Sequence, residues 1–178
     1  MQTFVPEKQL LDDPGFAAHR GAWLAKLDPD ILDPPIRDAV RTLNELPYCF
    51  TLQSCWGHFH GEETGLCREI PDTESLKPEL AYHYRIAYAA FCLENSPRGR
   101  EFLGLLRRVP AQAGPGLVQF GCADWFWNQL VNTYVLQVQP RDRATVDALD
   151  VAGIQARELR NARDALWNAL WMLAAERI

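Results

Sequence analysis

The segment SCWGHFH, residues 54–60, brings a hydroxyl, a thiol and two imidazoles close together in the chain. Thiolate and imidazole are the ligands that tetrahedral zinc prefers. With Cys67 the spacing becomes C-x2-H-x-H-x6-C, which is tighter and less regular than the usual paired zinc motifs. One interpretation is a metal site made by Cys55, His58, His60 and Cys67. The alternative is that Cys55 is a small buried hydrophobe and that the histidines are solvated loop residues.

A thiol near imidazoles is also compatible with nucleophilic catalysis, in which a histidine accepts the thiol proton. His58 is only three residues from Cys55. The base of such a pair is therefore expected from elsewhere in the fold, for example from His83.

Clustered aromatic residues form a second candidate site in CADWFWN, residues 122–128. Trp125, Phe126 and Trp127 could stack on a nucleobase or an adenine ring. Asp124 could bind a ribose hydroxyl or an amine. The alternatives are that the aromatic residues belong to the core and that Asp124 is a turn or cap residue.

Basic residues gather at the two ends of a predicted helix over residues 96–109. This segment contains one acidic residue, Glu101, and four arginines: Arg98, Arg100, Arg107 and Arg108. Guanidinium groups suit contacts with a phosphate backbone. A solvated helix face is the alternative interpretation.

The elements that position these residues follow from apolar spacing and from proline. Asp-Pro pairs act as cap and first helical position for helices over residues 14–27 and 33–46. A strand over 48–55 then delivers Ser54 and Cys55 to its C-terminal end. Residues 56–80 show no lasting apolar period, so we expect a long loop there, acidic over residues 61–80.

The rest of the chain continues this mixture of strands and helices. The pattern predicts strands over 81–93, 116–127 and 132–139, the helix over 96–109, and helical structure from 143 to the end. This order predicts an α+β fold with a mainly antiparallel sheet covered on one side by helices. We expect one domain over residues 1–178, with residues 143–178 as a long helical C-terminal element packed on it.

The predicted helix followed by LNELPYCFTLQSCWGH, residues 43–58, resembles the wybutosine-synthesis methyltransferase family, the third enzyme of the tRNA wybutosine pathway. That family has a strand ending in Ser-Ser-Cys-Ser-Gly-Arg. Here the matching positions are Ser54, Cys55 and Gly57, whereas Gln53, Trp56 and His58 replace a serine, a serine and the arginine. A weaker match covers residues 134–142, with Gln137 where the family has histidine.

The resemblance implies an α+β fold, S-adenosylmethionine as methyl donor and a tRNA base as acceptor. Ser54, Cys55, Gly57 and His58 would lie at the cofactor, with the glycine allowing close approach of a ligand to the backbone. Asp124 joins this predicted cofactor set, and the four arginines of residues 98–108 form the predicted substrate contact. His58 cannot reproduce the forked hydrogen bonding of the arginine that it replaces.

Composition excludes several classes of protein. The 178 residues are 48% hydrophobic, which is typical of a folded chain, and 18 basic against 23 acidic residues give a net charge of -5. This charge disfavours tRNA binding through the overall field. There is no P-loop, GxGxxG, HExxH or GxSxG motif.

The same sequence bears on location and redox state. No apolar run is long enough to span a bilayer, and the N-terminus has early acids and prolines, so we expect a cytoplasmic protein without membrane contact. Five cysteines are an odd and scattered set, which favours reduced thiols over disulfides.

The sequence thus predicts a small-ligand-binding protein resembling S-adenosylmethionine-dependent tRNA methyltransferases, whether or not methyl transfer is retained. The alternative is a non-enzymatic module that binds zinc through the Cys55 to Cys67 region or binds a protein partner. In that case Trp167 and Trp171, one helical turn apart, could form a homo-oligomer surface if exposed.

Overall fold

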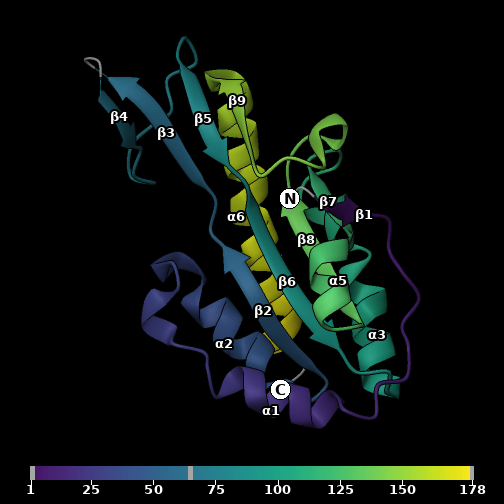
Figure 1. The fold of residues 1–178 in the computed structure, drawn as a ribbon. Helices are drawn as coiled ribbons and strands as arrows, with labels where there is room; N and C mark the ends of the chain where they lie inside the picture. Colours follow the sequence, from purple (N-terminus) through teal and green to yellow (C-terminus); the bar gives the residue numbers. More distant parts are fainter. Residues whose placement is uncertain (1–2, 64–65, 177–178) are drawn as a thin grey trace.

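Two antiparallel sheets form the frame of the computed structural model, which describes residues 3–63 and 66–176. The five-stranded sheet has the order β1-β7-β8-β6-β2 and the four-stranded sheet the order β4-β3-β5-β9 (Figure 1). The strands are β1 Phe4–Val5, β2 Cys49–Cys55, β3 His58–Glu63, β4 Leu66–Glu69, β5 Ala81–Arg85, β6 Ala87–Leu93, β7 Val118–Ala123, β8 Thr133–Val138 and β9 Ala148–Ala152. The predicted α+β class with antiparallel pairing is confirmed.

Two strand pairs pass directly from one sheet into the other. Strand β2 continues into β3 after Trp56 and Gly57, and β5 continues into β6 after Ile86. Cys55 pairs with Tyr88 on the five-stranded side, and His58 pairs with Arg85 on the four-stranded side. We call residues 55–58 and 85–88 the hinge, because the two paired segments of the chain pass from one sheet to the other there.

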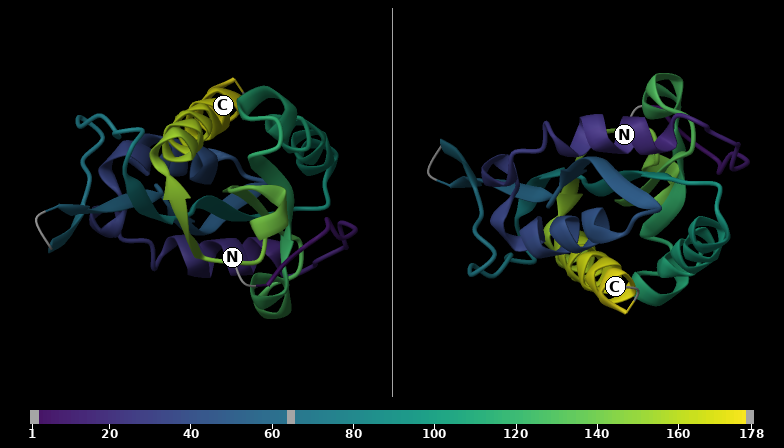
Figure 2. Two further views of the ribbon diagram at one scale, coloured as in Figure 1. Left: turned by 90° about the horizontal axis from the view of Figure 1, so that it is seen from above. Right: turned by 90° about the horizontal axis from the view of Figure 1, so that it is seen from below.

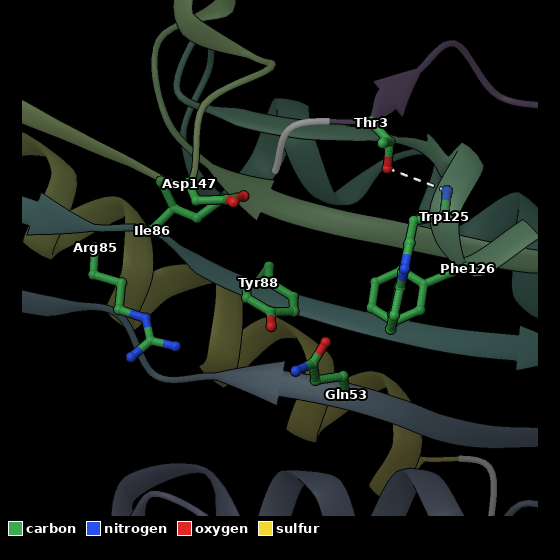
Figure 3. Close-up of a pocket in the computed structure, with 8 residues that line it drawn as sticks. All are labelled: Thr3, Gln53, Arg85, Ile86, Tyr88, Trp125, Phe126 and Asp147. Atoms are coloured by element: carbon green, nitrogen blue, oxygen red, sulfur yellow. Dashed lines mark hydrogen bonds between the residues drawn. The ribbon is translucent and has the colours of Figure 1, made fainter.

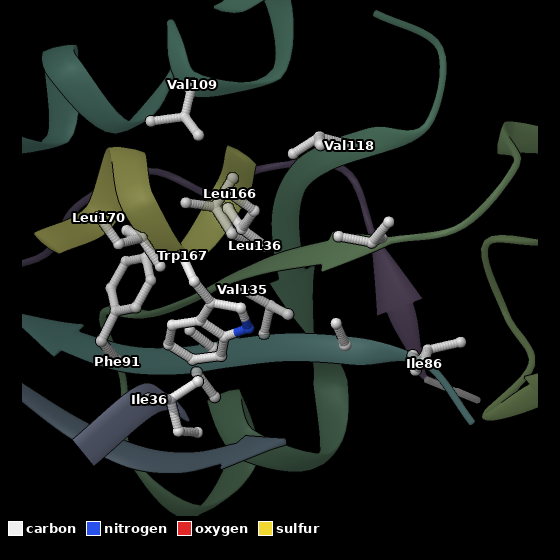
Figure 4. Close-up of a cluster of buried hydrophobic side chains, with 14 of the residues drawn as sticks. Ile36, Ile86, Phe91, Val109, Val118, Val135, Leu136, Leu166, Trp167 and Leu170 are labelled. Carbon is white, nitrogen blue, oxygen red and sulfur yellow. The ribbon is translucent and has the colours of Figure 1, made fainter. Parts of the chain in front are cut away.

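The long helix α6, Gly153–Ala175, lies across one side of both sheets (Figure 1). Its buried residues include Leu166, Trp167 and Leu170, which lie near Phe91 of β6 in the close-up of the core (Figure 4). Helix α2, Arg37–Glu45, packs beside α6 with a strongly amphipathic sequence, since its apolar residues recur at helical spacing. The predicted long C-terminal helix is confirmed over residues 153–175.

The opposite side of the five-stranded sheet is also covered. In Figure 2, α1 (Phe16–Leu24) and α5 (Asp124–Gln129) lie across the sheet from α6. Phe16 of α1 packs against Phe50 and Cys92 in a separate small apolar cluster. The expectation of helices on one side only was wrong for this sheet.

The remaining helices are short. They are α3 Pro97–Leu106, α4 Val109–Ala113 and the 3-10 turns Pro29–Ile31, Pro34–Ile36 and Arg141–Arg143. Ser96 caps α3 by accepting a hydrogen bond from the Gly99 amide, as the Ser-Pro pattern predicts. No helix among the described residues is both long and apolar enough to cross a bilayer.

Three sequence-based element predictions were wrong. The predicted loop 56–80 contains β3 and β4, the second half of the predicted strand 116–127 is helix α5, and residues 148–152 form β9 rather than helix. In β3 the alternation is real, with Phe59 and Gly61 buried on one face, but histidines and acids elsewhere in the strand hide it.

Candidate functional site

The hinge brings three side chains of different elements together. Asp33 stands before the 3-10 turn Pro34–Ile36, Cys55 ends β2 and His58 begins β3. One ligand-type atom from each lies within 4.8 Å of the others. His58 Nε2 is 3.4 Å from Asp33 Oδ2, and the same carboxylate oxygen accepts a 2.8 Å hydrogen bond from the Trp56 amide. We refer to Asp33, Cys55 and His58 as the hinge triad.

Asp33 was predicted only as a helix cap, yet its side chain makes no cap hydrogen bond. The Asp-Pro-Pro sequence starts the turn through the fixed backbone of proline, and this leaves the carboxylate able to bind Trp56 across the hinge. Sequence reasoning therefore recognised two members of the hinge triad and missed the third.

A second carboxylate orients His58 from the other side of its ring. Glu69 of β4 lies opposite His60 in the β3–β4 register, and its Oε1 is 2.6 Å from His58 Nδ1. This contact leaves Nε2 facing Asp33, with the Cys55 side chain close by. The ring is thus held between Glu69 on one nitrogen and Asp33 on the other.

These neighbours control the charge of His58. A hydrogen bond with Cys55, together with Glu69 and Asp33, outweighs the opposing effect of burial and raises the pKa of His58 to about 9. A histidine with this pKa is an imidazolium at neutral pH in the metal-free protein.

We expect the pH dependence of stability to report this charge. Because the folded-state pKa lies above the ordinary value near 6.5, the contribution of His58 is complete below that value and is lost as the pH rises through about 9. In chelator-treated protein, the difference in unfolding free energy between wild type and His58→Gln should therefore shrink over this window. An NMR titration of His58 with a midpoint near 6.5 would contradict the prediction. In Cys55→Ala the midpoint should fall, since the largest cause is removed.

Beneath the hinge, Arg163 of α6 is almost completely buried, with 1% of its surface exposed. Its guanidinium lies 4.0 Å from the centre of the Trp56 ring and donates to Gly57 O at 2.9 Å and to Asp72 Oδ1 at 2.6 Å. Trp56 Nε1 in turn donates to Asp72 Oδ2 at 2.6 Å. Trp56 is therefore part of a structural network that fixes the hinge on α6.

A cavity of about 350 Å³ opens beside the hinge, lined by aromatic residues and a few polar side chains. In Figure 3, Tyr88 and Gln53 lie close together between Arg85 on one side and Trp125 with Phe126 on the other. The complete lining is Thr3, Gln53, Arg85, Ile86, Tyr88, Trp125, Phe126 and Asp147. Burial, and then the nearby Cys55, raises the pKa of Tyr88 to about 12, so its phenol stays protonated.

Other predicted cofactor residues lie at different places. Ser54 and Cys55 are neighbours on β2, so their side chains point to opposite faces, and Ser54 pairs with Ala89. Gly57 has φ +92°, and a Cβ there would lie 2.7 Å from Ala87 Cβ. Asp124 starts α5 and pairs with Lys8 at 2.5 Å. Ala87 thus fills the space beside Gly57 that a ligand would need. Trp125 and Phe126, which follow Asp124, line the cavity, whereas Asp124 itself does not.

The predicted metal set Cys55, His58, His60 and Cys67 is brought together only in part. His60 shares the face of His58 on β3 and pairs with His83, and its Nδ1 is buried without a hydrogen-bond partner. The side chain of Cys67 lies outside the described residues; its backbone pairs with Glu62. The four cysteines whose side chains are described, Cys49, Cys55, Cys92 and Cys122, are free thiols.

The four predicted phosphate contacts are all exposed, at and beyond the ends of α3. Arg107 binds Glu7, with Nη2 to Oε1 at 2.5 Å, and Arg100 binds Asn95. The remaining two are Arg98 and Arg108. Because α3 follows the end of β6 that is remote from the hinge, these arginines do not line the cavity.

The two tryptophans of the predicted oligomer surface differ. Trp167 is 3% exposed and belongs to the core, whereas Trp171 is 43% exposed, as is its neighbour Met172. A homo-oligomer contact through Trp171 stays a prediction, and Trp167 packs the helix on the sheet.

The fold is similar to that of proteins of known structure. No family model and no curated protein matches the chain. The PH1069 protein from Pyrococcus horikoshii aligns with a TM-score of 0.51 and 10% identity over 88% of this chain and 96% of that one. A second structure, of the PH1069 protein from Pyrococcus horikoshii OT3, gives 0.50 and 11% over 92% and 99%.

A hypothetical protein from Aeropyrum pernix gives a TM-score of 0.40 at 14% identity, over 81% of this chain and 96% of that one. The chain is an α+β protein of two antiparallel sheets, and the candidate site lies at their junction. In particular, its fold is similar to that of the PH1069 protein.

Proposed function

We propose that this protein binds a small adenosyl ligand, with S-adenosylmethionine as the probe, in the cavity beside the hinge. The observation that carries the proposal is the lining itself, which combines Tyr88, Trp125 and Phe126 with the guanidinium of Arg85. A volume of about 350 Å³ is within the range of small-molecule sites, which are mostly apolar with a few convergent polar groups.

Each part of such a ligand has a chemical counterpart in the cavity. An adenine ring can stack on Trp125, which is 57% exposed and so available to a ligand. A sulfonium cation is attracted to the face of Tyr88 or Trp125. A carboxylate suits Arg85, whose planar group can hold it with two hydrogen bonds.

The resemblance of residues 43–58 to the wybutosine methyltransferase signature supports the choice of probe. Gln53 of that segment lines the cavity, and Cys55 and His58 pair in the strand register with two other lining residues, Tyr88 and Arg85. The proposal is for ligand binding. RNA as methyl acceptor is disfavoured by the net charge of -5 and by the pairing of Arg107 with Glu7.

The test is thermal unfolding of the whole chain with and without about 1 mM S-adenosylmethionine. At 100 times its dissociation constant, a ligand of the native state stabilises by about 2.7 kcal/mol, which corresponds to a rise in Tm of about 5 to 10 °C for a chain of this size. Trp125→Ala should lose most of this shift. Trp171→Ala is the matched control, because Trp171 is similarly exposed but lies on α6 outside the cavity. No shift in the folded wild type would contradict the proposal.

A further inference from the structure

We propose that the hinge triad, Asp33, Cys55 and His58, binds one divalent transition-metal ion of the zinc type. A carboxylate, a thiol and an imidazole converge there within 4.8 Å. These are the three ligand types that zinc takes in proteins. The distance of 3.4 Å between His58 Nε2 and Asp33 Oδ2 also matches the edge of about 3.4 Å that tetrahedral zinc with ordinary Zn–N and Zn–O bonds requires.

The surroundings of His58 are those of a metal ligand. Histidines that bind zinc almost always donate the second ring N–H to a carboxylate or carbonyl, which fixes the tautomer and the ring orientation. Glu69 Oε1 lies 2.6 Å from His58 Nδ1 and provides this partner, leaving Nε2 for the ion. Asp33 is likewise held in place, because its Oδ2 accepts the Trp56 amide.

The local charges favour a cation. Asp33 and Glu69 place two carboxylates around one imidazole, next to a thiol. A divalent cation is attracted by these carboxylates, and when it binds, Cys55 and His58 each release a proton to solvent, so that the ligands are a thiolate and a neutral imidazole.

The site is accessible and leaves room for a further ligand. The side chains of Asp33 and His58 are 28% and 20% exposed, so an ion can reach them from solvent, while Cys55 is 6% exposed and protected. Three protein ligands leave one position of a tetrahedral ion open, as in catalytic zinc sites. Compared with the metal set predicted from the sequence, Asp33 takes the place of His60 and Cys67 as ligand, and Glu69 is the partner of His58. Metal binding at the hinge triad does not depend on the adenosyl ligand.

The experiment uses the full chain after removal of metal with a chelator, titrated with Co²⁺ alone. We expect a thiolate-to-cobalt charge-transfer band that saturates at one ion per chain and is displaced by Zn²⁺. Cys55→Ser should abolish the band, and His58→Gln and Asp33→Asn should each weaken binding by at least 10-fold. Glu69→Gln should weaken it by about 10- to 100-fold, the usual effect of losing such a partner.

Matched variants separate this site from nonspecific binding. Cys122→Ser removes another buried thiol, and His83→Gln removes a histidine of the neighbouring strand β5, so both should bind Co²⁺ as wild type does. Asp33→Asn keeps an oxygen for the Trp56 amide and stays informative if Cys55→Ser unfolds. The proposal is overturned by absence of stoichiometric binding, by a band that survives Cys55→Ser, or by full affinity in folded Asp33→Asn. Trp125→Ala should retain the metal, which distinguishes this site from the adenosyl cavity.

Discussion

Replacing Arg163 by methionine is expected to lower the free energy of unfolding by about 2 kcal/mol, because it removes the hydrogen-bond donor that a buried backbone carbonyl needs. The guanidinium is 1% exposed and donates to Gly57 O, Asp72 and Asp164 while stacking on Trp56. Methionine can fill much of the volume but leaves the Gly57 carbonyl without its donor, and a buried unsatisfied group costs about 1–3 kcal/mol.

The loss of stability at acid pH gives a second measurement of the contact between Arg163 and Asp72. Burial alone would raise the pKa of Asp72, but hydrogen bonds from Arg163 and Trp56 hold it below its usual value. A lowered pKa contributes stability that is present above the ordinary value and is lost as the pH falls through the folded-state pKa. In Arg163→Met this part of the acid dependence should be weaker.

Urea unfolding at several pH values measures both effects. Arg157→Met is the matched control, since Arg157 is exposed on the same helix and its loss should change stability by less than about 0.5 kcal/mol. Equal stabilities of the Arg163 and Arg157 variants would show that the network around Trp56 does not hold the hinge.

The contrast between Arg163 and Cys55 shows how far sequence reasoning reaches. Cys55 and His58 are close in the chain and of reactive types, so the sequence alone predicts them as site residues. The partners of His58 come from distant segments, Asp33 from the turn before α2 and Glu69 from β4, and Arg163 of α6 binds the neighbouring Gly57 carbonyl. No local pattern marks such contacts, because they depend on how the two sheets and α6 pack.

The fold was predictable where local signals agree with packing. Helices α1 and α2 follow Asp-Pro pairs and apolar spacing, and β2 and β8 are rich in β-favouring residues. Helix α5 shows the limit, since the aromatic run at Trp125 favours a strand by composition but forms a helical turn after β7. Strand β9 is only Ala148–Ala152 and runs directly into α6, so its alternation is too short to separate from the helical pattern.

Gly57 gives the last prediction, because the hinge requires a residue without a side chain there. Its φ of +92° costs other residues about 1–3 kcal/mol, and an added Cβ would lie 2.7 Å from Ala87 Cβ and 2.9 Å from the Ala87 backbone nitrogen. A neighbouring backbone cannot move away as a flexible side chain can. Gly57→Ala is therefore expected to lose about 2–6 kcal/mol of stability, the sum of about 1–3 kcal/mol of backbone strain and about 1–3 kcal/mol of overpacking.

Gly116→Ala separates the two contributions. Gly116 has a similar φ of +85°, but a Cβ there meets nothing within 4 Å, so this variant should show the backbone strain alone. Chemical unfolding of both variants gives the cost of the Ala87 contact as the difference, expected to be at least about 1 kcal/mol. Equal losses would mean that the strands can separate at the hinge without cost. Such freedom would contradict a rigid hinge at the crossing of β2–β3 and β5–β6.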